Sequence, residues 1–139
     1  MYLQARTFIR TALIYLASAG ILGGAILAGD GLGWASALAP ARPLFYHLLT
    51  VGWATQLIGG VALWMFPPLS RDRPRGDERL GWAAYVGLNA GLLLRVAEPF
   101  LAWRPGPWVT PALVASAILQ FVAVCCLIAA LWPRVKGRR

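Results

Sequence analysis

Residues 43–67 read PLFYHLLTVGWATQLIGGVALWMFP, a run of 25 residues without an aspartate, glutamate, lysine or arginine. About 20 consecutive, mainly apolar residues are enough for a helix to cross the hydrocarbon core of a bilayer. Pro43 suits the first turn of such a helix, and Pro67-Pro68 is expected to end it. The run therefore predicts a membrane-spanning helix over residues 43–67.

Three further runs are also long and mainly apolar, over residues 7–29, 79–103 and 108–132. The first begins like a signal peptide, but its apolar part is too long for a signal core, so we expect a retained helix. Short segments rich in glycine, proline or charge separate the runs, including SRDRPRGDE at residues 70–78. The sequence predicts one all-α domain, residues 1–139, an integral membrane bundle of four helices.

The composition supports a membrane protein. Hydrophobic residues make up 59% of the chain and charged residues only 13%, against about 25% in soluble domains. The mean hydropathy is +0.63. The net charge of +8 lies mainly beside the apolar runs and forms no basic face with interleaved aromatic residues, which argues against nucleic-acid binding.

The basic residues also predict the orientation. Ten of them lie at the N-terminal end of the first run, from the 70–78 region to the start of the third run, and after the last run, whereas the other two loops hold only Arg42 and Arg104. Cytoplasmic loops of membrane proteins carry the excess of lysine and arginine. We therefore expect both termini and the middle loop in the cytoplasm.

Polar residues inside the spans form two groups. Gln56, Asn89 and Gln120 fall near the midpoints of three spans and could hydrogen-bond together, as interhelical contacts or as a polar path. Small residues recur at packing distance in Gly20-x-x-x-Gly24 and Gly87-x-x-x-Gly91, a pattern compatible with packing inside the chain or with self-association.

The second group lies nearer the outer surface. His47 is expected about 12 Å above the bilayer centre, and Arg95 and Glu98 about 7 and 12 Å above it. Arg95 and Glu98 are three residues apart and can neutralise each other. The stripe formed by Gly87, Gly91 and Arg95 would leave room for a flat molecule. An imidazole ligates heme iron well and an arginine pairs with propionates, although a packing histidine and a structural ion pair would look the same.

Two stretches resemble a known family. Residues 47–67, HLLTVGWATQLIGGVALWMFP, resemble the second helix of heme–copper oxidase subunit I and its nitric oxide reductase and NnrS-like relatives. Residues 88–99, LNAGLLLRVAEP, look like the following helix in small oxidase-like membrane proteins of bacteria. The resemblance implies that His47 is an axial ligand of heme b, and it implies a bacterial inner membrane.

The chain also departs from that family. It has no second histidine, so the copper ligands are missing and a binuclear centre that reduces oxygen or nitric oxide is excluded for this chain alone. His47 could be shared between two copies across a heme, could hold a five-coordinate heme, or could belong to a scaffold without heme. We favour the shared heme in a homodimer, because symmetry supplies the missing ligand.

The sequence thus predicts a small heme b protein that transfers electrons or senses a gas, with His47, Arg95 and Glu98 as cofactor-binding residues. The alternative is a non-catalytic structural or assembly subunit of a respiratory membrane complex, without a cofactor of its own. A four-helix multidrug transporter is disfavoured, because those proteins use an acidic residue in the first helix and this chain has none before Asp30.

Overall fold

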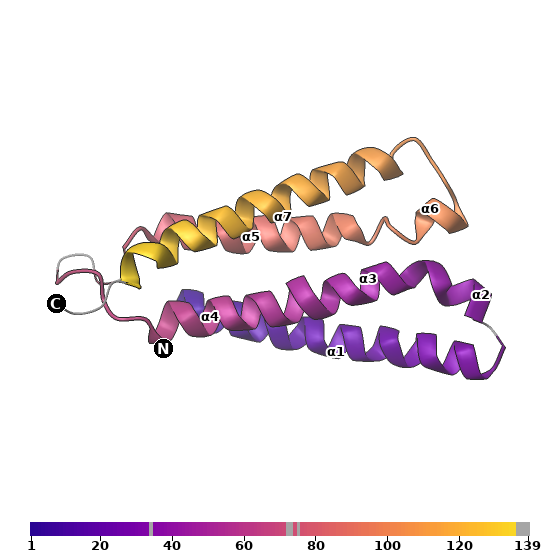
Figure 1. Ribbon diagram of the computed structural model, residues 1–139, viewed down its shortest axis with the longest axis horizontal. Helices are drawn as coiled ribbons and strands as arrows, with labels where there is room; N and C mark the ends of the chain where they lie inside the picture. The colour runs from indigo at the N-terminus through magenta and orange to yellow at the C-terminus, as the bar shows by residue number, and fades with distance from the viewer. Residues whose placement is uncertain (34, 72–73, 75, 136–139) are drawn as a thin grey trace.

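Two antiparallel helical hairpins lie side by side in the protein (Figure 1). The structure is a computed structural model that describes residues 1–33, 35–71, 74 and 76–135. All regular elements in these residues are helical, which confirms the all-α part of the expected fold class. The seven α-helices are α1 (Leu3–Gly31), α2 (Ala35–Leu38), α3 (Arg42–His47), α4 (Gln56–Met65), α5 (Glu78–Arg95), α6 (Phe100–Trp103) and α7 (Val109–Leu131). Two 3₁₀ turns, η1 (Ala39–Ala41) and η3 (Trp132–Arg134), and a π-helical segment, η2 (Leu48–Thr55), complete them.

Four stretches of the described residues are long and apolar enough to cross a membrane: Leu3–Gly31, Ala39–Met65, Glu78–Trp103 and Val109–Arg134. The number of spanning-length helices therefore agrees with the sequence prediction. The expected spans 7–29, 43–67, 79–103 and 108–132 overlap them closely. The largest differences in a boundary are at the starts of the first two spans, at Leu3 where residue 7 was expected and at Ala39 where residue 43 was expected.

The hairpins give the bundle two distinct ends (Figure 1). The N-terminus, the connection between α4 and α5 and the end of α7 lie at one end, which we call the terminal end. Helices α2 and α6 lie at the opposite end, the distal end. The charge bias of the sequence rests partly on Arg73, Arg75, Lys136, Arg138 and Arg139, which lie outside the described residues, as does Trp34.

Local sequence signals account for several helix boundaries. Pro43 occupies the first turn of α3, as expected. Phe66 is extended, with φ −65° and ψ 144°, because the residue before a proline is held away from the helical region. The carboxylate of Asp77 accepts a hydrogen bond from the Arg79 N–H at 2.9 Å and so caps α5.

The third span is interrupted, whereas the sequence predicted a continuous helix over residues 79–103. Helix α5 ends at Arg95, and the N–H groups of Val96, Ala97 and Glu98 donate to carbonyls three residues earlier. Proline lacks an N–H and disfavours a helical residue before it, so Pro99 explains the break. The short helix α6 resumes after it.

The buried core joins both hairpins near the terminal half of the bundle. Its members are Phe8 on α1, Leu63 on α4, Ala84 and Leu88 on α5, and Ala123 and Leu127 on α7. Because this core ties all four spans together, the polar groups described next are held on a fixed frame.

Candidate functional site

His47 is the last residue of α3 and is half-buried. Its ring nitrogen Nδ1 lies 2.9 Å from the carbonyl oxygen of Pro43, one turn earlier. A carbonyl oxygen only accepts, so Nδ1 is the donor and carries the proton. In the neutral ring the lone pair then belongs to Nε2, which is the nitrogen left for a ligand.

The segment that follows His47 is wound more widely than an α-helix. In η2 the Thr55 hydroxyl donates to the Thr50 carbonyl five residues earlier, at 2.9 Å, and the Thr50 hydroxyl donates to Tyr46 at 2.7 Å. A Cβ added to Gly52 would lie 2.8 Å from Cγ of Tyr15, so η2 packs this closely against α1 only because residue 52 has no side chain. Such π-helical turns are rare in proteins, and many of those that occur lie at functional sites.

Arg95 and Glu98 form an ion pair at the break in the third span. Arg95 Nε lies 3.0 Å from Glu98 Oε2, and the side chains are 19% and 13% exposed. This confirms that the two residues neutralise each other. Among the described residues, neither of these two atoms has another polar partner, and no hydrogen bond to the terminal guanidinium nitrogens is found. The remaining donors of Arg95 are therefore available.

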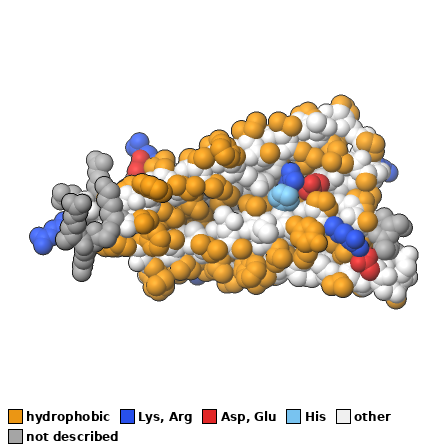
Figure 2. All heavy atoms as spheres, in the orientation of Figure 1, with side chains coloured by type: hydrophobic (Ala, Val, Ile, Leu, Met, Phe, Trp, Pro, Cys, Tyr) orange, Lys and Arg blue, Asp and Glu red, His pale blue; other side chains and the backbone are white. Residues whose placement is uncertain are grey.

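The structure brings the three predicted site residues to one region. Helix α3, which ends at His47, contacts helix α5, which ends at Arg95. Figure 2 shows the only histidine of the chain at the surface, directly beside one basic and one acidic side chain. The predicted site thus lies at the surface where α3 contacts α5, in the distal half of the bundle, a region that we call the seam.

The glycine stripe beside Arg95 does not form the expected cleft. A Cβ on Gly87 would lie 2.9 Å from the Ala123 Cβ, and a Cβ on Gly91 would lie 2.6 Å from the Gln120 Cγ. Both glycines therefore serve the close packing of α5 against α7, and no flat molecule fits there. By contrast, a Cβ on Gly20 or Gly24 would meet nothing within 4 Å, so that stripe is not a packing motif within the described chain.

The expected carboxamide layer is present in part. Asn89 Nδ2 donates to Gln56 Oε1 at 3.2 Å, and Gln56 Nε2 lies 3.5 Å from Asn89 Oδ1. Gln120 is not part of this pair, because its amide donates to Ser116 Oγ on its own helix at 2.9 Å. Gln56 is fully buried, so the pairing with Asn89 satisfies an amide that has no access to solvent or lipid.

Tyrosines that the sequence analysis did not single out complete this network. The Tyr15 hydroxyl donates to Asn89 Oδ1 at 2.9 Å, and Asn89 Nδ2 also donates to the Tyr85 carbonyl at 2.8 Å. The hydroxyls of Tyr85 and Thr11 are 2.8 Å apart. The network binds α1, α4 and α5 together and has the geometry of structural contacts.

Arg134 is a second feature that the sequence analysis did not distinguish from the other basic residues of the tail. It is 5% exposed and donates to the carbonyls of Leu63, Phe66 and Pro67 at 3.0, 2.6 and 3.2 Å. A helix leaves its last carbonyls without partners, and its C-terminus favours a cation. Arg134 therefore caps α4 from the end of the fourth span.

The described residues contain no group of three or more histidine, cysteine, aspartate or glutamate side chains that could hold a metal ion by themselves. Neither a known protein family, nor a curated protein, nor a solved structure matches this chain.

Proposed function

We propose that this chain is a four-pass membrane protein that binds heme b, with His47 as an axial ligand, and that it transfers electrons or senses a diatomic gas. The observation that carries the proposal is the hydrogen bond from His47 Nδ1 to the Pro43 carbonyl. Such a bond fixes the tautomer and the orientation of an imidazole and leaves Nε2 for the metal, as in many histidine ligands.

We infer that the terminal end faces the cytoplasm and the distal end the outside. Apart from Arg95, the chain has twelve basic residues; ten lie at or beyond the ends of the spans on the terminal side, and only Arg42 and Arg104 lie at the distal loops. This distribution follows the positive-inside rule. Together with the resemblance to small bacterial oxidase-like proteins, it favours the inner membrane of a bacterium.

The residues of the seam fit a heme by their chemistry. The guanidinium of Arg95 has terminal donors without partners among the described residues, and an arginine forms strong paired hydrogen bonds with carboxylates such as propionates. The carboxylate of Glu98 pairs with Nε of Arg95 and so holds the Arg95 side chain in one orientation. When bound, heme would supply reversible one-electron chemistry or a site for a gas.

A homodimer would complete the ligation. The chain has one histidine, and that histidine lies at the surface of the seam instead of in an enclosed cavity (Figure 2). Below it, Ile58 and Met65 are 69% and 68% exposed, so none of the described helices covers that side of α4. A two-fold axis along this surface would bring the same histidine from both copies toward one heme.

The absorption spectrum of the purified full-length chain, expressed with ample heme, tests this function. We expect a Soret band that His47→Gly removes, that added imidazole restores in this variant, and that the neighbouring Tyr46→Phe leaves unchanged. Circular dichroism checks that all variants keep their helices. A colourless wild-type protein would end the proposal. Indifference to His47→Gly, together with co-purification of larger partners, would favour the structural or assembly subunit instead.

A further inference from the structure

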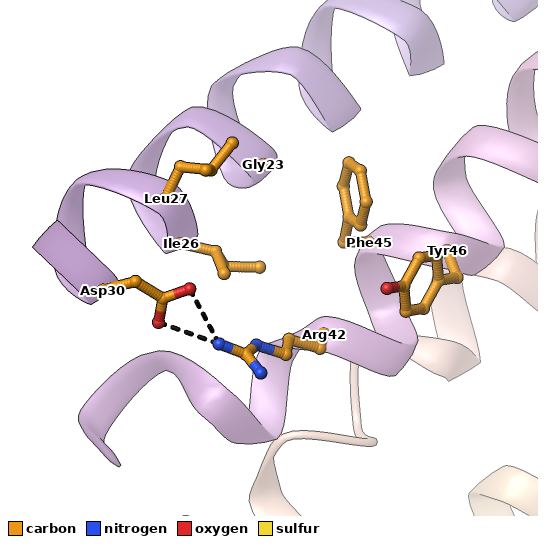
Figure 3. Close-up of a pocket in the computed structure, with 7 residues that line it drawn as sticks. All are labelled: Gly23, Ile26, Leu27, Asp30, Arg42, Phe45 and Tyr46. Atoms are coloured by element: carbon orange, nitrogen blue, oxygen red, sulfur yellow. Dashed lines mark hydrogen bonds and ion pairs between the residues drawn. The ribbon is translucent and has the colours of Figure 1, made fainter. Parts of the chain in front are cut away.

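A second polar feature lies at the distal end, at the end of α3 opposite to His47. Asp30, in the last turn of α1, pairs with Arg42, the first residue of α3 (Figure 3). Carboxylates are unfavourable at a helix C-terminus and guanidinium groups at an N-terminus. The stability of the two helices therefore does not explain why these charges occupy these positions.

The pair is bonded in an asymmetric way. Both carboxylate oxygens of Asp30 lie 2.8 Å from one nitrogen, Nη2 of Arg42. Within the described part of the chain, Nε and Nη1 of Arg42 have no partner, although a guanidinium can bind a carboxylate through two nitrogens. The side chains are 46% and 39% exposed. Arg42 thus presents two free nitrogen donors directly beside the Asp30 carboxylate, which can still accept further hydrogen bonds.

An apolar cavity adjoins this pair. It measures about 300 Å³ and is lined on its apolar side by Gly23, Ile26 and Leu27 of α1 and by Phe45 of α3 (Figure 3). Leu27 and Tyr46 at its edge are largely exposed, so the cavity opens sideways, toward the position of lipid if the helices span a membrane. This volume is at the lower limit for small-molecule sites, so it suits part of one acyl chain.

We propose that this cavity binds one phospholipid with a primary ammonium in its headgroup, such as phosphatidylethanolamine, from the outer leaflet. The phosphate accepts hydrogen bonds from Arg42 Nε and Nη1, because guanidinium and phosphate geometries match. The ammonium donates to the Asp30 carboxylate, and one acyl chain enters the cavity beside Phe45. A zwitterionic headgroup matches a site that carries both charges. An anionic headgroup has no ammonium to bind Asp30, so its negative charge would lie beside the Asp30 carboxylate.

The inference depends on membrane insertion and is independent of heme. The experiment is native mass spectrometry of the full-length chain in detergent, with phosphatidylethanolamine, phosphatidylcholine and phosphatidylglycerol added at equal concentrations. We expect about tenfold tighter binding of phosphatidylethanolamine, because a quaternary ammonium donates no hydrogen bond to Asp30 and phosphatidylglycerol has no ammonium. Equal binding of the three lipids, or a preference for phosphatidylglycerol, would overturn the proposal.

Variants separate the two halves of the site. Arg42→Gln should reduce the binding of all three lipids, and Asp30→Asn should abolish only the preference for phosphatidylethanolamine over phosphatidylcholine. Leu27→Trp, at an exposed edge position, should obstruct the acyl chain without disturbing the core. Arg104→Gln is the matched control, since it removes the other distal loop arginine. Unchanged lipid affinity in Arg42→Gln, or an unchanged preference for phosphatidylethanolamine in Asp30→Asn, with native helicity, would also overturn the site. The Soret band of the same samples reports separately on the proposed heme.

Discussion

The paired amides of Gln56 and Asn89 offer the sharpest test of the interior of the bundle. Asn89→Leu removes the partner of a fully buried Gln56 and of the Tyr15 hydroxyl. Interhelical hydrogen bonds in membrane proteins contribute on average about 0.6 kcal/mol and up to about 1.7 kcal/mol. With one contact at 3.2 Å and a long one at 3.5 Å, we expect a coupling of about 1 kcal/mol between Gln56 and Asn89.

The assay is a double-mutant cycle on the free energy of unfolding in mixed micelles. Asn89→Leu alone should lower that free energy by about 2 kcal/mol, because two polar groups lose their partner. The double variant with Gln56→Leu should lose less than the sum of the single variants by the coupling energy. Gln120→Leu is the matched control, because Gln120 bonds within its own helix and should be additive with Asn89→Leu. Equal coupling of Asn89 to both glutamines would refute the arrangement.

Three further predictions concern the Arg134 cap, the packing at two glycines and the Arg95–Glu98 ion pair. Arg134→Met should lower the free energy of unfolding by about 2–4 kcal/mol, measured by the same titration, because three helix-end carbonyls lose a charged donor; a change below about 0.5 kcal/mol would contradict the cap. Gly91→Leu should destabilise the bundle by about 1–3 kcal/mol through overpacking, whereas Gly20→Leu should leave the unfolding of one chain unchanged; similar losses would show that the assigned faces are wrong. Glu98→Gln should weaken heme binding about fivefold in a heme titration by releasing Arg95, and unaltered affinity would remove Glu98 from the site.

The fold was predictable because a membrane span is encoded by length and composition. Each of the four runs is too long and too apolar to be anything but a spanning-length helix, and Pro43 and Pro67 mark their boundaries through local backbone chemistry. The interruption at Pro99 was also encoded locally, but the mean hydropathy of the whole run does not reveal the effect of a single proline on the backbone. The sequence did not predict the π-helical turn of η2, and the packing of its Gly52 against the Tyr15 ring is a tertiary contact that no local pattern reveals.

For the candidate site, the sequence predicted only the depth of each residue along its helix. Counting residues brought His47, Arg95 and Glu98 to one layer, and the ion pair confirms the local part of that reasoning. The sequence could not show which helix covers each glycine stripe: Gly87 and Gly20 occur in the same motif, yet one packs on α7 and the other is open. For the same reason Arg134 resembled the rest of the basic tail, since its role depends on where α4 ends.

A heme titration of the wild-type full-length chain tests the central claim most directly. If Nε2 of His47 ligates iron and two copies share the cofactor, the Soret band should saturate at one heme per two chains, with the spectrum of a low-spin, bis-histidine heme. Saturation at one heme per chain would contradict the shared ligation and leave a five-coordinate heme. The absence of any Soret shift on addition of heme would contradict the claim that His47 is a heme ligand.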